Sequence, residues 1–181
     1  MFKLLLDTGS IYNRTLNHYT HALQYMATLE EMGELAQVLS KIYRRKNVEE
    51  NMKAMVEEAA DVINMVEQSM HANSSVEYLN LLHEPVYYNR PELAVAAYSK
   101  KAARFALLIS TAMEMRMEDP SLREDVDGSD MMVLGADMLS SLRDMLNAFG
   151  FGDEEVQEAR EFKLNRIVTR MNEDEQKAKN A

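Results

Sequence analysis

The chain has 181 residues, 46% of them hydrophobic, which is enough for one domain with a substantial core. Its net charge of −10 argues against a duplex nucleic-acid surface, because such a surface needs basic residues to neutralise phosphates. The absence of cysteine excludes disulfides and thiolate metal sites, no apolar run is long enough to span a bilayer, and we expect a cytoplasmic protein that binds no membrane.

The chain is predicted to be all-α, because it has few glycines and prolines and long stretches rich in Leu, Met, Ala, Glu and Lys. Apolar residues at helical spacing predict a bundle of four long helices with shorter terminal helices. The expected ranges are 13–45, which includes a short opening helix, then 48–72, 91–117, 129–148 and 154–171. A loop is expected around residues 84–91, and the polar residues 172–181 are expected to fray.

These helices are expected to form one domain over residues 1–181, with a motif-bearing helical pair at 13–73 and a second pair plus final helix at 91–171. The segment 98–149 faintly resembles 22–73 with a shift of 76 positions, since both consist of a helix, a polar break and a helix. Under that alignment the acids at 31, 34 and 58 fall on uncharged residues. The second half is therefore either a degenerate repeat that lost these acids or a generic helical hairpin.

Two acidic motifs stand out, EEMGE at residues 30–34 and EAAD at residues 58–61. Acids three positions apart share one face of a helix, so two neighbouring helices could present four carboxylates to one spot. The first motif lies in a helix that is apolar on nearly all sides, which we expect to be buried. Crowded carboxylates are costly unless a cation lies among them, and hard oxygen ligands favour Mg²⁺, Mn²⁺ or Ca²⁺ over zinc.

The alternative to a metal site is a set of salt bridges between helices, with Lys41, Arg44 or Lys53 as the basic partner. Acids at this spacing are also common on solvated helix faces. The chain contains such a comparison in residues 155–161, where three glutamates lie among polar residues and are expected to be exposed. Spacing alone leaves the metal site and the salt bridges open.

The two motifs, in this order on two predicted helices, resemble the signature of the all-α nucleotide pyrophosphohydrolases. These are the MazG-like enzymes, with dimeric dUTPases and dCTP pyrophosphatases as relatives. Their pattern is two Glu, two free positions and Glu, followed after a variable stretch by Glu, two free positions and Asp. All five acidic positions are present here. The resemblance is specific over residues 29–66 and thin beyond them.

This resemblance implies a MazG-like fold and Mg²⁺, with Mn²⁺ as a substitute, bound by Glu31, Glu34, Glu58 and Asp61. The same four acids would be catalytic, together with Glu30, which would orient water or another carboxylate. The implied reaction is hydrolysis of a nucleoside triphosphate between its α- and β-phosphates, giving a monophosphate and pyrophosphate. A homodimer or homotetramer is also implied, and the apolar faces of four long helices favour it.

Seven further residues are candidates for substrate binding: His18, His21, Lys41, Arg44, Lys163, Asn165 and Arg166. The last three resemble a Lys/Asn/Arg cluster that holds phosphates in some relatives, although the spacing is not a clean match. The two histidines precede the first motif, where relatives often place base-contacting residues, and a surface position is the alternative. The remaining two lie at the end of a predicted helix, where complementing the helix dipole explains them equally well.

Two other classes of protein compete with the hydrolase. A ferritin-like di-metal protein is disfavoured, because none of the four histidines has an acid three positions before it. The stronger rival is a non-catalytic helical interaction or assembly protein that retains the fold and the acids.

Overall fold

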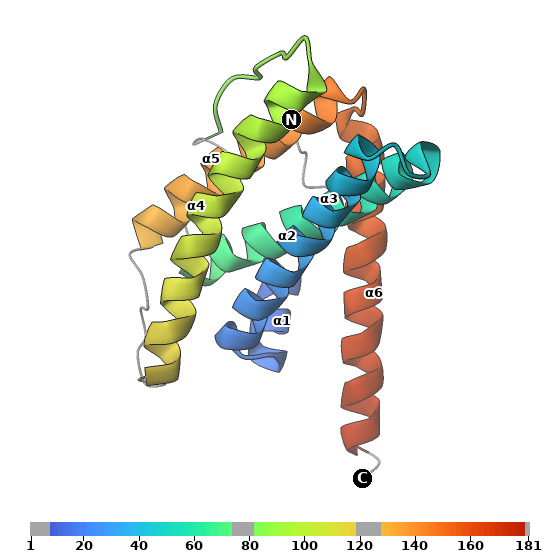
Figure 1. The fold of residues 1–181 in the computed structure, drawn as a ribbon. Coiled ribbons are helices and arrows are strands. Elements are labelled where there is room, and N and C mark those ends of the chain that lie inside the picture. Colours follow the sequence, from blue (N-terminus) through green and yellow to red (C-terminus); the bar gives the residue numbers. More distant parts are fainter. Residues whose placement is uncertain (1–7, 74–81, 119–127, 180–181) are drawn as a thin grey trace.

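The computed structural model describes residues 8–73, 82–118 and 128–179, and within these ranges the chain is entirely helical apart from turns and loops (Figure 1). Their helices are α1 (Thr8–His18), α2 (His21–Tyr43), α3 (Val48–Asn73), α4 (Pro91–Glu118), α5 (Gly128–Ala148) and α6 (Asp153–Lys179). The predicted all-α class is confirmed. None of the described helices is long and apolar enough to cross a membrane.

A break at Tyr19 and Thr20 divides the first predicted helical region into α1 and α2. Thr20 has extended backbone angles (φ −71°, ψ 154°), and its side-chain oxygen accepts a hydrogen bond from the backbone N–H of Leu23 at 3.3 Å. A threonine in this conformation is a standard helix N-cap, so α2 begins immediately after it. The expected loop is also present, since residues 82–90 contain no helix.

The expectation of a frayed tail after residue 171 is wrong over residues 172–179, because α6 continues to Lys179. Arg14 of α1 explains the extension: its Nη2 donates to Glu175 Oε1 at 2.8 Å and to Asn172 Oδ1 at 2.6 Å. These bonds to α1 stabilise the polar C-terminal end of α6, which water alone would not hold in a helix. With 27 residues, α6 is therefore a long helix and not a short terminal one.

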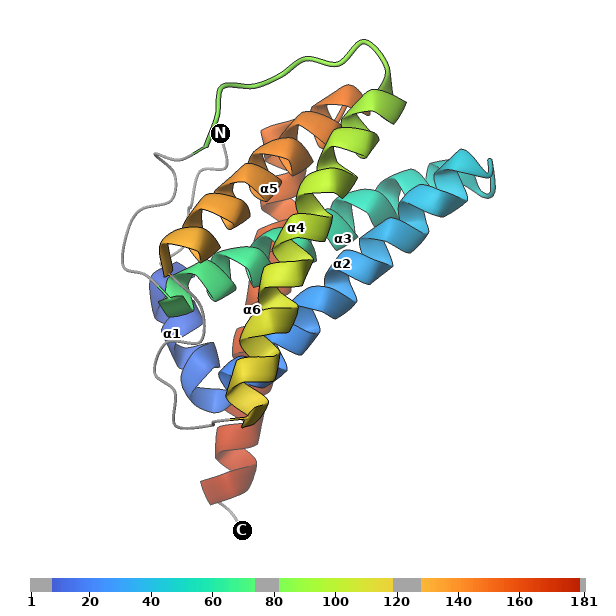
Figure 2. The same cartoon turned by 60° about the vertical axis from the view of Figure 1, so that its left-hand side comes forward.

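Helix α3 lies at the centre of the fold and contacts α1, α2, α5 and α6, whereas α4 packs on α2 and α5. Figure 2 shows the α2–α3 pair beside the α4–α5 pair, with the C-terminal end of α6 extending beyond the other helices. The apolar stripe of α3 forms much of the core, and Met55, Ile63 and Val66 are fully buried. This central position leaves α3 flanked by α2 on one side and α6 on another.

The expectation that α2 is buried on nearly all sides is wrong. Leu23 and Met26 are more than half exposed, and Tyr43 and Glu34 are exposed as well. The reason is that only α3 packs closely along α2, while α4 covers only part of the remaining surface of this helix. The acids of the first motif therefore lie at the edge of the core rather than within it.

Candidate metal centre

Three glutamates from the two acidic motifs converge in the structure. Glu31 and Glu34 from α2 and Glu58 from α3 each present a carboxylate oxygen, and these oxygens lie within 4.8 Å of one another. Asp61 lies one turn beyond Glu58 on α3 and joins the group electrostatically, because its charge raises the pKa of Glu31. The helical spacing of each motif and the packing of α2 against α3 together bring the three glutamates to one place, within electrostatic reach of Asp61.

Burial and mutual repulsion perturb the acids of this cluster. The pKa of Glu31 is raised from 4.5 to about 7, first by burial and then by the negative charges of Asp61, Glu34 and Glu58. The pKa of Glu58 is also raised, by burial and by Glu34, against the opposing charge of Lys163. Burial is the first cause of both shifts and the neighbouring negative charges add to it, so the cluster favours neutral carboxyl groups.

Helix α6 supplies the positive charge that the cluster has. Lys163 Nζ donates a hydrogen bond to Asp61 Oδ2, and both side chains are less than one fifth exposed. Burial lowers the pKa of Lys163, but its bond to Asp61 and the charges of Asp61, Glu58 and Glu57 outweigh that effect, so the pKa is raised overall. Lys163 is therefore charged at neutral pH.

Arg166 lies one turn after Lys163 on α6 and also acts on the cluster. Burial raises the pKa of Asp61, while Lys163 and Arg166 oppose that rise. The guanidinium carbon of Arg166 lies 5.9 Å from the ring centre of Phe162, whose side chain is 63% exposed. Lys163 thus bonds to Asp61 from α6, and the exposed Arg166 adds positive charge that acts on the same acid.

The basic residues expected to pair with the acids are not the ones that do. Among the described ion pairs, none joins Lys41, Arg44 or Lys53 to the cluster. Lys41 and Arg44 are exposed at the C-terminal end of α2, where Arg44 Nε donates to the carbonyl of Ser40 at 3.3 Å. The predicted basic partners are therefore wrong. The residue that pairs with Asp61 is Lys163, which lies on a helix distant in sequence.

The other predicted site residues lie outside the cluster. Glu30 is exposed on α2, and Asn165 is exposed on α6. His18 faces the end of α6, with its Nε2 3.6 Å from Asp174 Oδ2. His21 packs its ring edge-on against Tyr25, and it precedes Glu31 by ten residues, about 15 Å along the helix. The structure therefore brings neither histidine to the acids.

A buried polar network beside the cluster was not anticipated from the sequence. Glu67 of α3 and Arg160 of α6 form an ion pair in which both side chains are at most 2% exposed. Asn64 accepts from Arg160 Nε at 3.0 Å, and Tyr12 of α1 donates to Glu67 at 2.7 Å. The available signal was Glu67 itself, a charged residue within the apolar stripe of α3, which needs a buried partner.

This network lies one helical turn from the Asp61–Lys163 pair on both helices. Asn64 follows Asp61 by three residues, and Arg160 precedes Lys163 by three residues. Because a buried ion pair is satisfied in only one alignment of its helices, the network sets the register of α6 against α3. That register places Lys163 opposite Asp61.

No family model, curated protein or solved structure matches this chain. The chemistry of the site is therefore inferred from its own residues. Glu31, Glu34 and Glu58 place three carboxylate oxygens within 4.8 Å of one another, and the fourth acid, Asp61, is bonded to Lys163. Lys163 and Arg166 supply positive charge from α6 beside these acids.

Proposed function

We propose that this protein is a Mg²⁺-dependent nucleoside triphosphate pyrophosphohydrolase of the MazG-like type. The observation that carries the proposal is the convergence of Glu31, Glu34 and Glu58 within 4.8 Å, next to the Asp61–Lys163 pair. Oxygen ligands on two helices suit Mg²⁺ or Mn²⁺, and adjacent cations suit a polyphosphate. Neither the carboxylates nor the cations alone require a nucleotide, but together they fit a metal–triphosphate complex.

The roles of the side chains follow from their positions. Glu31, Glu34, Glu58 and Asp61 would hold the metal, which would neutralise charge on the phosphates and make the attacking water more acidic. Lys163 exchanges Asp61 for phosphate oxygens, and Arg166 assists it at the rim. An adjacent carboxylate that does not ligate the metal would accept the proton of the attacking water. The water oxygen bonds to the α-phosphorus, the bond to the bridging oxygen breaks, and pyrophosphate leaves.

We also propose a MazG-like core in which α4–α5 is a degenerate copy of α2–α3. A shift of 76 positions carries the range of α3 onto 124–149, which contains α5, and the range of α2 onto 97–119, which overlaps α4. The position equivalent to Glu31 is then Leu107, whose side chain is 69% exposed. Exposed Leu107, Val133 and Phe162 support assembly into a homodimer or homotetramer.

The second candidate is a non-catalytic helical interaction or assembly protein that retains the fold. The bond between Lys163 and Asp61 favours it, because this lysine partly neutralises the cluster without a metal. In that case the acids would serve the packing of α6 and no nucleotide would be turned over.

Pyrophosphate release from a panel of NTPs and dNTPs with Mg²⁺ separates the two functions. Glu58→Ala combined with Asp61→Ala is expected to abolish release while the helical circular dichroism is retained. The matched control is Glu154→Ala combined with Glu158→Ala on α6, where both acids are exposed. The hydrolase proposal fails if no nucleotide yields pyrophosphate and calorimetry with Mg²⁺ or Mn²⁺ plus a triphosphate gives no heat.

A further inference from the structure

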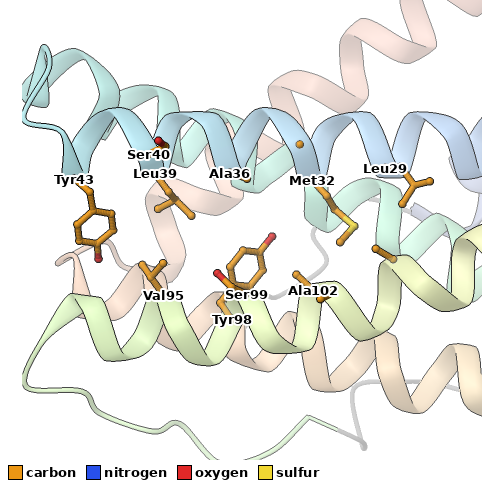
Figure 3. Close-up of a pocket in the computed structure, with 13 residues that line it drawn as sticks. Leu29, Met32, Ala36, Leu39, Ser40, Tyr43, Val95, Tyr98, Ser99 and Ala102 are labelled. Carbon is orange, nitrogen blue, oxygen red and sulfur yellow. The ribbon is translucent and has the colours of Figure 1, made fainter.

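A groove of about 440 Å³ runs between α2 and α4, on a different side of α2 from the acidic cluster (Figure 3). Bulky residues such as Leu29, Met32 and Tyr43 contribute to its walls. Between them the wall is made of small side chains, which leave the space open. These are Gly33, Ala36, Ser40, Ser99, Ala102, Ala103 and Ala106. None of the residues that line the groove is charged.

Tyr98 gives this groove a specific polar feature. Its side chain extends from α4 toward α2 (Figure 3), yet the residue is only 3% exposed. Its hydroxyl has no hydrogen-bond partner among the described residues. Burial raises the pKa of Tyr98, so the hydroxyl stays neutral and available as a donor. A buried hydroxyl without a partner is costly, and an acceptor placed in the groove removes that cost.

We propose that the groove binds a neutral, mainly apolar organic molecule that accepts a hydrogen bond from the Tyr98 hydroxyl. The uncharged lining excludes an ionic ligand, since nothing within it compensates a buried charge. The volume lies within the range of small-molecule sites, which are typically apolar with few polar groups. This site is separate from the proposed metal centre and does not depend on the proposed function.

A docked helix from a second copy is the other occupant to consider, and Tyr98 disfavours it. Carbonyl groups within a helix already accept bonds from their own helix, so a packed helix satisfies the hydroxyl only where a side chain, or a carbonyl that accepts a second bond, lies opposite Tyr98. A small molecule with a carbonyl or a ring nitrogen fills the same space and supplies the acceptor. The affinity lost in Tyr98→Phe and the oligomeric state together distinguish the two occupants.

Fluorescence titration with Nile red tests the site, because this dye is neutral, apolar and carries a carbonyl acceptor. The full chain is expected to bind it saturably at one site. Tyr98→Phe is expected to weaken binding about three- to tenfold, the usual worth of one neutral hydrogen bond. Pyrene, which has no acceptor, is expected to bind the two proteins equally. Without any ligand, Tyr98→Phe is expected not to lower the melting temperature, since the hydroxyl it removes has no partner.

Ala106→Leu, which fills the groove, is expected to weaken Nile red binding about tenfold or more. Thr111→Leu is the matched control, because Thr111 is exposed on α4 and does not line the groove. The proposal is overturned if Nile red does not saturate, or if the two leucine variants bind it equally well. Equal affinity of Tyr98→Phe and the unchanged protein overturns the assigned acceptor. A dimer in sedimentation that Ala106→Leu dissociates shows that a second copy covers the groove, and also overturns it.

Discussion

Replacing Glu31 with glutamine is expected to stabilise the metal-free protein at pH 8. The carboxylate of Glu31 lies among Glu34, Glu58 and Asp61, and burial and these charges raise its pKa from 4.5 to about 7. An acid whose pKa is higher in the folded state than in the unfolded state destabilises the folded protein when it ionises. Glutamine keeps nearly the same shape without the charge, so it removes this penalty.

The size of the effect follows from the pKa shift. One pKa unit corresponds to ~1.4 kcal/mol, so the shift of Glu31 sets an upper limit of ~3 kcal/mol. Solvent screens much of this repulsion, because Glu31 is only partly buried and Glu34 is exposed, so we expect ~1 kcal/mol. For a chain of this length, that raises the melting temperature by roughly 2–4 °C.

The assay is thermal unfolding followed by circular dichroism at pH 8 with EDTA. Glu158→Gln on the exposed face of α6 is the matched control and is expected to change nothing. The gain of Glu31→Gln is expected to shrink at pH 5, because folded Glu31 is largely protonated there. Added Mg²⁺ is expected to reverse the order, since it stabilises the unchanged protein more than the variant. A lower melting temperature of Glu31→Gln at pH 8 with EDTA would refute the reasoning, because Glu31 would then have a favourable partner.

Three further perturbations probe other parts of the fold. Lys163→Ala removes a cation from the cluster. Calorimetry is expected to show that this variant binds Mg²⁺ alone up to about tenfold more tightly and binds a triphosphate more weakly. Weaker binding of both ligands would contradict the role given to Lys163. Arg160→Ala leaves Glu67 charged and buried, and urea unfolding is expected to show a loss of ~3–5 kcal/mol, partly recovered by adding Glu67→Leu. Gly135→Ala places a methyl group 2.5 Å from the sulfur of buried Met70 and is expected to lower the free energy of unfolding by ~1 kcal/mol. The methyl group of Gly33→Ala meets nothing within 4 Å, so this variant is expected to raise the free energy of unfolding by ~0.5–1 kcal/mol. Equal melting temperatures of the two glycine variants would contradict that packing difference.

The sequence by itself determined the helical class, most helix boundaries and the grouping of the acids in two motifs. Those features are local, since apolar spacing and turn residues act over a few positions. The break at Thr20 was also readable in principle, because a threonine N-cap is a local signal. The continuation of α6 to Lys179 was not, because it depends on a partner, Arg14, that lies far away in the chain.

The pairing of charges within the candidate site was decided only by the tertiary structure. Helical spacing places Glu31 beside Glu34 and Glu58 beside Asp61. The cation that pairs with Asp61 is Lys163, and not Lys41 or Arg44, because of where α6 packs. That packing is set by the buried Arg160–Glu67 pair, whose partners are 93 residues apart. Likewise, the groove with Tyr98 exists because small side chains on α2 and α4 face each other. Contacts between distant segments depend on the whole core, and no local pattern in the chain encodes them.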